Sequence, residues 1–187
     1  MTSFPYRFSP LLSVHGSADF DFLPATLPTV RTAMESVYVV GWGFNSVLNY
    51  FECLQVGTNL TDLTLKKKKV TVRELGGCMS PIWPSYFKDC SSVIFVVDSA
   101  NIAQISSSCI QLLSVLSAKP LCNASVLILF NKRDVPCVMT PTEMKSLFRM
   151  DDIIASATQP ITVLELSARS GQGLQEVLRW LESIAVK

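Results

Sequence analysis

Apolar and polar residues follow two patterns along this chain, and the two patterns predict strands and helices in turn. Residues 93–98 and 126–130 are continuous apolar runs of the kind that parallel sheets place between two layers of helices. Residues 106–117 and 140–148 instead carry apolar side chains at a spacing of three or four, which is typical of an amphipathic helix. Strands that alternate with helices predict an α/β protein with a doubly wound, mostly parallel sheet and helices on both faces.

The same patterns predict the remaining elements of one domain at residues 35–187. They are strands at residues 37–40, 60–65, 70–75 and 161–166, and helices at residues 45–54 and after Gly173. Residues 1–34 contain several prolines and show no sustained periodicity. We therefore expect them to form an irregular, flexible lead.

Polar residues with the chemistry of guanine recognition follow the apolar run at residues 126–130. A carboxylate at Asp134 can accept two hydrogen bonds, from the N1–H and the exocyclic amine of guanine, and adenine lacks this pair of donors. Asn131 can bond N7 and tie neighbouring loops together, and the aliphatic stem of Lys132 can cover one face of the ring. A polar turn after a strand is the alternative for the same residues, because Asn and Asp are common in turns.

A second polar loop, Ser167-Ala168-Arg169, follows the apolar run at residues 161–166. The backbone N–H of Ala168 can donate to O6 of guanine, whereas adenine carries an amine there and would leave that donor unpaired. Ligands of parallel sheets bind outside the carboxyl ends of the strands, where we expect both loops. The second loop therefore favours a guanine site over a simple turn.

Together with these loops, two further motifs resemble those of the Arf-like branch of the small GTPases. Residues 56–59 (Val-Gly-Thr-Asn) resemble switch I, and residues 74–77 (Glu-Leu-Gly-Gly) resemble the start of switch II. The resemblance extends from about residue 55 to the carboxyl terminus. It implies a P-loop-NTPase-like fold whose pocket binds GTP or GDP with Mg²⁺.

The resemblance also implies roles for individual residues. Thr58 would ligate Mg²⁺ and sense the γ-phosphate, Glu74 would reach a water bound to the ion, and Gly77 would lie at the nucleotide. The remaining pocket residues would be Asn131, Lys132, Asp134, Ser167, Ala168 and Arg169. Proteins of this family act as GTP-dependent switches in membrane and ciliary traffic, and they recruit effector proteins through switch I and switch II.

The sequence departs from the family pattern where the phosphates would bind. The phosphate loop G-x-x-x-x-G-K-[S/T] is absent, since no Gly-Lys-Ser or Gly-Lys-Thr occurs, and residues 41–46 (Gly-Trp-Gly-Phe-Asn-Ser) are a poor substitute. Losing that cradle removes about 6–8 kcal/mol, or roughly 10⁴–10⁶ in affinity. Cys78 also stands where the family has the Gln that orients the attacking water. We expect a first strand and P-loop that are replaced or incomplete, weak nucleotide binding and slow hydrolysis.

A protein-interaction module without nucleotide is the alternative function. Such a module would keep the sheet and the guanine loops as a scaffold and bind partners through Trp83, Tyr86 and Phe87. Packing of these three aromatic residues inside the domain is the competing interpretation.

Composition narrows the partners and the compartment. Hydrophobic residues make up 49% of the chain and charged residues 17%, and the net charge of +1 gives no general attraction for nucleic acid. No apolar stretch is long enough for a transmembrane span. Six cysteines without a C-x-x-C pair, and His15 as the single histidine, make a zinc site improbable and indicate a reducing cytoplasm. We expect a monomer.

Four consecutive lysines at residues 66–69 form the single charge run of the chain. Their position between two predicted strands favours a solvated hairpin tip. A patch that binds anionic membrane lipids is the alternative.

Overall fold

The computed structural model describes residues 35–41, 58–65 and 68–185. These ranges form a six-stranded sheet with the order β2-β3-β1-β4-β5-β6. The strands are β1 (Glu35–Gly41), β2 (Thr58–Leu65), β3 (Lys68–Leu75), β4 (Ser92–Asp98), β5 (Ser125–Asn131) and β6 (Ile161–Glu165). The edge strand β2 runs antiparallel to β3, and the other pairings are parallel. The prediction of a mostly parallel α/β sheet is confirmed.

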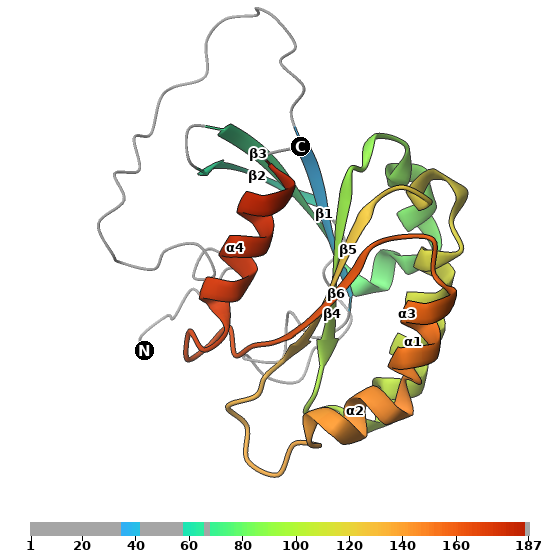
Figure 1. Ribbon diagram of the computed structural model, residues 1–187, viewed down its shortest axis with the longest axis vertical. Coiled ribbons are helices and arrows are strands. Elements are labelled where there is room, and N and C mark those ends of the chain that lie inside the picture. The colour runs from blue at the N-terminus through green and yellow to red at the C-terminus, as the bar shows by residue number, and fades with distance from the viewer. Residues whose placement is uncertain (1–34, 42–57, 66–67, 186–187) are drawn as a thin grey trace, which may run out of the picture.

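Helices cover both faces of the sheet (Figure 1). Helix α4 (Leu174–Ile184) lies on one face. The other face carries α1 (Ile105–Leu116), α2 (Pro141–Leu147) and α3 (Met150–Ser156). Short 3₁₀ segments are η2 (Gly77–Asp89), η3 (Ile102–Gln104) and η4 (Lys119–Leu121).

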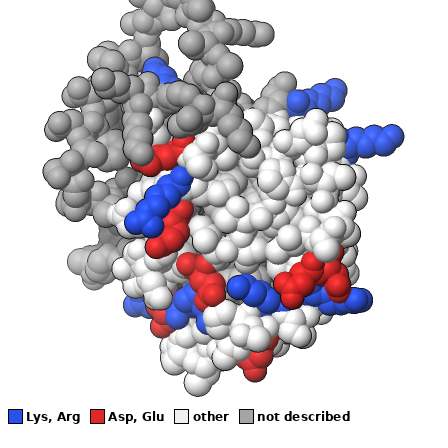
Figure 2. Space-filling model, viewed as in Figure 1, with Lys and Arg blue, Asp and Glu red and all other residues white. Residues whose placement is uncertain are grey.

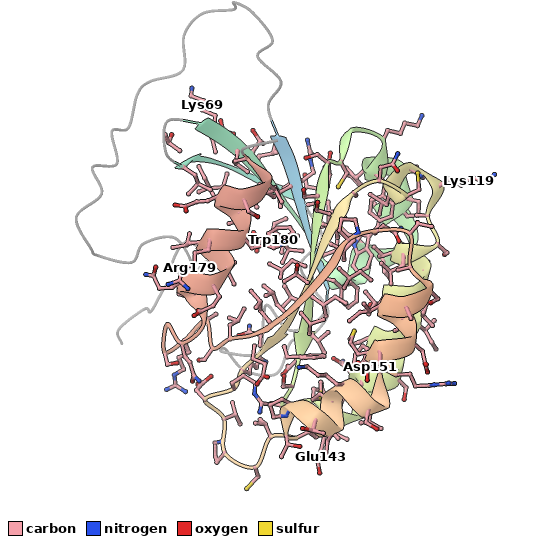
Figure 3. All side chains as sticks on the ribbon, viewed as in Figure 1. Lys69, Lys119, Glu143, Asp151, Arg179 and Trp180 are labelled. Carbon is pink, nitrogen blue, oxygen red and sulfur yellow. The ribbon has the colours of Figure 1, made fainter. Side chains whose placement is uncertain are left out.

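Two apolar cores follow from the alternation of side chains along the strands. In β5, Val126, Ile128 and Phe130 pack toward α1 and α2, whereas Leu127 and Leu129 pack toward α4. Trp180 of α4 lies beside the second core (Figure 3). Because both faces are buried, the middle strands need the continuous apolar runs that the sequence contains.

Strand β1 occupies the centre of the sheet, between β3 and β4. Val39 aligns with Glu74 in β3 and with Ile94 in β4, and the side chains from Val37 to Val40 are buried. The strand predicted at residues 37–40 is therefore present, and it fills the position where an empty slot would leave two unpaired strand edges. The predicted helix at 45–54, the lead at 1–34 and most of the turn at 41–46 lie outside the described residues.

The predicted hairpin is present, but the lysine run is not wholly its tip. Lys68 and Lys69 already belong to β3, while residues 66 and 67 lie outside the described ranges. The pairing runs from Thr58 opposite Leu75 to Leu65 opposite Lys68. Strand β3 thus begins two residues before the predicted position.

The helix predicted at residues 140–148 is α2, and hydrogen bonds between Thr140 and Glu143 cap its start. The Glu143 N–H donates to Thr140 Oγ1 at 3.3 Å, and the Thr140 N–H donates to Glu143 Oε2 at 2.7 Å, which together make a capping box. Arg149, in the left-handed region with φ of 49°, separates α2 from α3. Helix α3 was not predicted.

The aromatic residues after the second switch-like motif lie mostly inside the protein. Trp83 and Phe87 of η2 are each 2% exposed, and Trp83 Nε1 donates to the Gly76 carbonyl at 3.0 Å. Tyr86 is half-buried. The hypothesis that all three form a partner-binding surface is therefore wrong for Trp83 and Phe87, because their apolar surface is already used in the core.

Cys90 behaves as a small residue packed against the core. Its Sγ donates to the Ser92 carbonyl at 3.2 Å, and burial raises the pKa of the thiol to about 12. Among the residues that the structure describes, Cys90, Cys109, Cys122 and Cys137 form no disulfide. No helix in the described ranges has the length and apolar character needed to cross a bilayer.

Candidate functional site

The two predicted guanine loops meet at the carboxyl edge of the sheet. Strands β4 and β5 are in register so that Asp98 aligns with Asn131, and Phe130 aligns with Glu165 in β6. The loops after β5 and β6 lie near one another at the lower edge of the sheet in Figure 1. The topology therefore places the polar residues that follow three adjacent strands next to each other.

Asn131 ties these loops together. Its residue is 7% exposed, and its Oδ1 accepts hydrogen bonds from the backbone N–H of Lys132 at 2.7 Å and of Ala168 at 3.0 Å. Since both partners are donors, the oxygen must point at them, and the Nδ2 group is the part of the amide that remains for N7 of a base. The Ala168 N–H, predicted to donate to guanine O6, is thus already engaged by Asn131.

Lys132 is held by a carboxylate that the sequence analysis did not identify. Lys132 Nζ lies 2.6 Å from Asp98 Oδ2, and the two side chains are only 13% and 7% exposed. Asp98 Oδ1 also accepts from the Ala100 N–H at 2.9 Å, which fixes the carboxylate at the end of β4. Lys132 adopts a φ of 67°, so its backbone turns sharply after β5 while its stem crosses toward β4. The sequence signal that could have identified Asp98 as a site residue is its position at the end of a buried strand.

Asp134 is oriented by the second loop. Ser167, which is fully buried, donates from Oγ to Asp134 Oδ1 at 2.6 Å, and its own Oγ accepts from the Ser170 N–H at 3.1 Å. Arg169 Nη1 lies 4.0 Å from Asp134 Oδ2, at the limit of an ion pair. A carboxylate has about four lone-pair sites. Asp134 therefore keeps acceptor capacity for two donors after Ser167 has fixed its position.

The loop after β6 depends on Gly173. This residue has a φ of 80°, and a Cβ there would lie 2.2 Å from the Glu165 carbonyl oxygen. Around it the Ser167 N–H donates to the Gln172 carbonyl, and the Gly171 N–H donates to the Ser167 carbonyl, both at 2.9 Å. Only glycine permits this close return of the backbone over the end of β6.

The switch-like residues lie farther along the same edge. Thr58 begins β2, Glu74 is near the end of β3, and Gly77 begins η2. From β3 to β5 the sheet takes three strand steps, or about 14 Å, and the register sets Glu74 level with Leu127, so Glu74 and Asn131 are farther apart than about 14 Å. The structure thus brings the base-type residues together and leaves the switch-like residues apart from them.

Thr58 and Glu74 do not converge. Thr58 is opposite Leu75, and Glu74 is opposite Asn59. Opposite residues of an antiparallel pair share a face and neighbours alternate, so Thr58 and Glu74 project from different faces of the sheet. Their joint role at a magnesium ion stays a prediction.

Comparison with known proteins agrees with this architecture. The sequence model of the ADP-ribosylation factor family matches residues 52–185. The chain belongs to this family. Human ADP-ribosylation factor-like protein 16 is 59% identical over 128 residues, which cover 68% of this chain and 64% of the human protein. Drosophila melanogaster ADP-ribosylation factor-like protein 1 is 31% identical over 130 residues, which cover 68% of this chain and 71% of that protein.

A solved structure has the same fold. The Arl6 BBS3 small GTPase from Trypanosoma brucei, with the bound nucleotide analogue GppNp, superposes with a TM-score of 0.69 at 19% sequence identity. The match covers 82% of this chain and 98% of the other. At that identity the likeness concerns the fold alone.

The polar side chains of this site suit a nucleotide base better than they suit a metal ion held by protein ligands alone. The described residues contain no group of three or more His, Cys, Asp or Glu able to hold a metal ion. Mg²⁺ is commonly held by one or two protein oxygens together with phosphate oxygens and waters. Any Mg²⁺ site here would therefore depend on the nucleotide phosphates, with Thr58 or Glu74 as single donors.

Proposed function

We propose that this chain is an Arf-family switch protein that recognises guanine through a preformed base site and holds the phosphates weakly. The observation that carries the proposal is the 2.6 Å bond from Ser167 Oγ to Asp134 Oδ1, which fixes a carboxylate where it can accept from the N1–H and the exocyclic amine of guanine. The Asn131 amide, fixed by two backbone donors, supplies the contact to N7. GTP or GDP is the expected ligand.

The stem of Lys132 completes the base site. Its ammonium group is neutralised by Asp98 at 2.6 Å, so the lysine acts as an apolar cover for the ring and not as a phosphate-binding charge. A guanine ring between this stem and the Ala168 loop would be buried from both sides. Adenine would present no pair of donors to Asp134, and this loss is the source of the expected selectivity.

The part of the chain expected at the nucleotide phosphates supports only weak nucleotide binding. No Gly-Lys-Ser or Gly-Lys-Thr occurs in the 187 residues, so the usual cationic cradle is missing from this chain. Lys69 is no replacement, because it lies six residues, or about 20 Å, from the carboxyl end of β3. Figure 3 shows Lys69 projecting at that distant end. We expect affinity in the micromolar range or weaker, and slow hydrolysis because Cys78 replaces the water-orienting Gln.

The cellular role that we propose is taken from the family. A cytoplasmic monomer that recruits effector proteins through the switch-like residues is the expected form. On the face drawn in Figure 2, acidic and basic side chains occur in small mixed groups, which supports protein partners over nucleic acid. The module that binds no nucleotide is less favoured, because Trp83 and Phe87 are unavailable to a partner.

Titration with fluorescent GTP, GDP and ATP, with Mg²⁺ and with EDTA, tests the proposal. We expect saturable binding of both guanine nucleotides at about 1–100 µM and at least about tenfold weaker ATP binding. Sub-micromolar binding that requires Mg²⁺ would contradict the weak phosphate site and indicate a complete switch. Equal binding of ATP, or no saturable binding of either guanine nucleotide up to about 1 mM, would favour the interaction module.

A further inference from the structure

Arg73 of β3 occupies an unusual position outside the base site. It aligns with Tyr38 of β1 on one side and with Leu60 of β2 on the other, so the three side chains form a row across one face of the sheet. Glu74, the next residue, projects from the opposite face. Arg73 is half-buried, and Tyr86 of η2 lies over it.

Two aromatic rings fix the Arg73 guanidinium. Its Cζ lies 5.8 Å from the ring centroid of Tyr38 and 5.6 Å from that of Tyr86, which is within the range of cation–π attraction. These contacts limit the rotamers of the side chain before any partner arrives. Less entropy is then lost when the planar guanidinium binds an anion.

Among the described residues, no carboxylate neutralises the positive charge of Arg73. Arg73 Nε is buried and has no hydrogen-bond partner, and within the described ranges no carboxylate forms an ion pair with the guanidinium. The nearest candidate in the strand pairing is Asp62, and its Oδ1 instead accepts from Thr71 Oγ1 at 2.7 Å. A charge with no carboxylate beside it is unfavourable in a half-buried position, so a carboxylate that reaches the terminal Nη groups would be favourable there.

Both elements beside this charge, β2 and η2, carry an exposed apolar side chain. Leu60 is 53% exposed and Ile82 of η2 is 48% exposed, while helices α1, α2 and α3 cover the other strands of this face. Asp62 and Thr64, on the same side of β2 as Leu60, are also exposed. The surface formed by Leu60, Arg73, Ile82 and Tyr86 combines a fixed cation with an apolar rim.

We propose that this surface binds a protein segment that presents a carboxylate beside an apolar side chain. The carboxylate pairs with the terminal Nη groups of the Arg73 guanidinium, and the apolar side chain packs on Leu60 and Ile82. The proposal extends the effector recognition of the proposed function to one residue and one partner chemistry. It is independent of base recognition, since Arg73 lies on the face opposite to Glu74 and belongs to neither guanine loop.

A matched pair of peptides tests the charge. The side-chain Nε–H of Arg73 is observed by ¹⁵N NMR in the full chain, and its signal is assigned by its loss in Arg73→Lys. The probes are acetyl-Leu-Glu-Leu-amide and acetyl-Leu-Gln-Leu-amide, which differ only in the carboxylate. We expect the Glu peptide to shift this resonance saturably and the Gln peptide to bind at least about tenfold more weakly.

A matched pair of variants tests the position. Lys69 is on the same strand and the same face as Arg73, is exposed, and is not part of the surface. We expect Arg73→Gln to weaken Glu-peptide binding at least about tenfold and Lys69→Gln to change it less than about twofold, as is usual for a remote exposed charge. Melting curves show whether each variant is folded, and the Arg73→Lys protein, which keeps the charge without the planar group, should bind with intermediate affinity.

Several results would overturn the proposal. Equal binding of the two peptides, absence of binding by both, or equal effects of the two Gln variants would each remove the role of Arg73. Sodium phosphate that shifts the Arg73 resonance as strongly as the Glu peptide would indicate a general anion site. Titration of the Arg73→Gln variant with GTP separates the two proposals, since we expect its nucleotide affinity to equal that of the wild type.

Discussion

The loops that follow β5 and β6 (the base loops) and the sheet edge that carries Thr58 and Glu74 (the switch-like edge) differ in how far their side chains are organised. In the two base loops, Asn131 Oδ1 accepts from the Ala168 N–H at 3.0 Å and Asp134 Oδ1 accepts from Ser167 Oγ at 2.6 Å, and both bonds cross from one loop to the other. At the switch-like edge, Thr58 is exposed and projects from the face opposite to Glu74. One region is organised before a ligand binds, whereas Thr58 and Glu74 in the other region do not converge on a common point.

This contrast separates base recognition from phosphate recognition. A carboxylate that is already oriented loses little freedom when guanine binds, so selectivity for the base can persist when total affinity is low. Phosphate binding needs positive charge and backbone donors at the carboxyl end of β1, and the chain has no P-loop lysine there. Substitutions in and beside the base loops can show whether base recognition is independent of phosphate recognition.

Gly173→Ala should have the largest effect, because it disrupts the loop that carries Ser167. The new Cβ would lie 2.2 Å from the Glu165 carbonyl oxygen in a backbone with φ of 80°, so we expect a loss of about 3 kcal/mol or more in the free energy of unfolding. Gly171→Ala is the matched control, since its φ is 83° but no atom lies within 4 Å of the added Cβ. Urea denaturation should show a loss of only about 1 kcal/mol there. Equal losses would mean that the left-handed backbone conformation alone, and not the close approach of the Cβ to the Glu165 oxygen, lowers the free energy of unfolding.

Asp134→Asn should change which base is bound with little effect on folding. The amide still accepts from Ser167 through its oxygen but offers a donor to the base, so guanine loses two charged hydrogen bonds, or about 2–3 kcal/mol in binding. The GTP-to-ATP selectivity should then disappear, and xanthosine triphosphate, which has a carbonyl in place of the amine, should bind instead.

Asp152→Asn is the control for this change of charge, because Asp152 pairs with Arg149 on the exposed surface of α3. It should leave the preference for GTP unchanged. If Asp134→Asn also kept that preference, Asp134 would not be the group that reads the base.

Asp98→Asn should have a smaller effect on both stability and binding. It leaves the Lys132 ammonium, 13% exposed, without its counter-charge, so we expect a loss of about 1–3 kcal/mol in the free energy of unfolding and a few-fold loss in GTP affinity. The pair Asp98→Asn and Lys132→Met forms a double-mutant cycle. The double variant should lose less stability than the sum of the single ones. Additive losses would show that the 2.6 Å contact contributes no coupling.

The sequence predicted the strands well because burial on both faces leaves little freedom in their composition. The runs at residues 93–98 and 126–130 match β4 and β5 to within one residue. Helix α3 was not predicted because it has seven residues and only Phe148 and the left-handed Arg149 separate it from α2. Segment η2 contains Pro81 and Pro84, which remove the donors of a regular helix and hide its periodicity.

The sequence predicts which residues form the candidate base site, but not all of the contacts between them. Asn131, Asp134 and Ser167 were identified because their chemistry and their place after strands agree. The partner of Lys132 was missed because Asp98 is 34 residues away, and only the register of β4 with β5 brings the two together. For the same reason the stacking of Arg73 on Tyr38 and Tyr86 required the structure.

The smallest expected effect concerns the helix that follows the first base loop. The Thr140 N–H and hydroxyl both donate to Glu143 and lower the pKa of its carboxyl group below the ordinary value of 4.5. Because the pKa is lowered in the folded state, this contribution to stability is present above about pH 4.5 and is lost as the pH falls through the lowered pKa. Glu143→Gln should therefore flatten the dependence of the melting temperature on pH in that acidic window. GTP-to-ATP selectivity at neutral pH should stay unchanged in this variant, since α2 takes no part in the bond from Ala168 to Asn131 or in the bond from Ser167 to Asp134. A loss of selectivity would show that the base loops need the capped helix for their organisation.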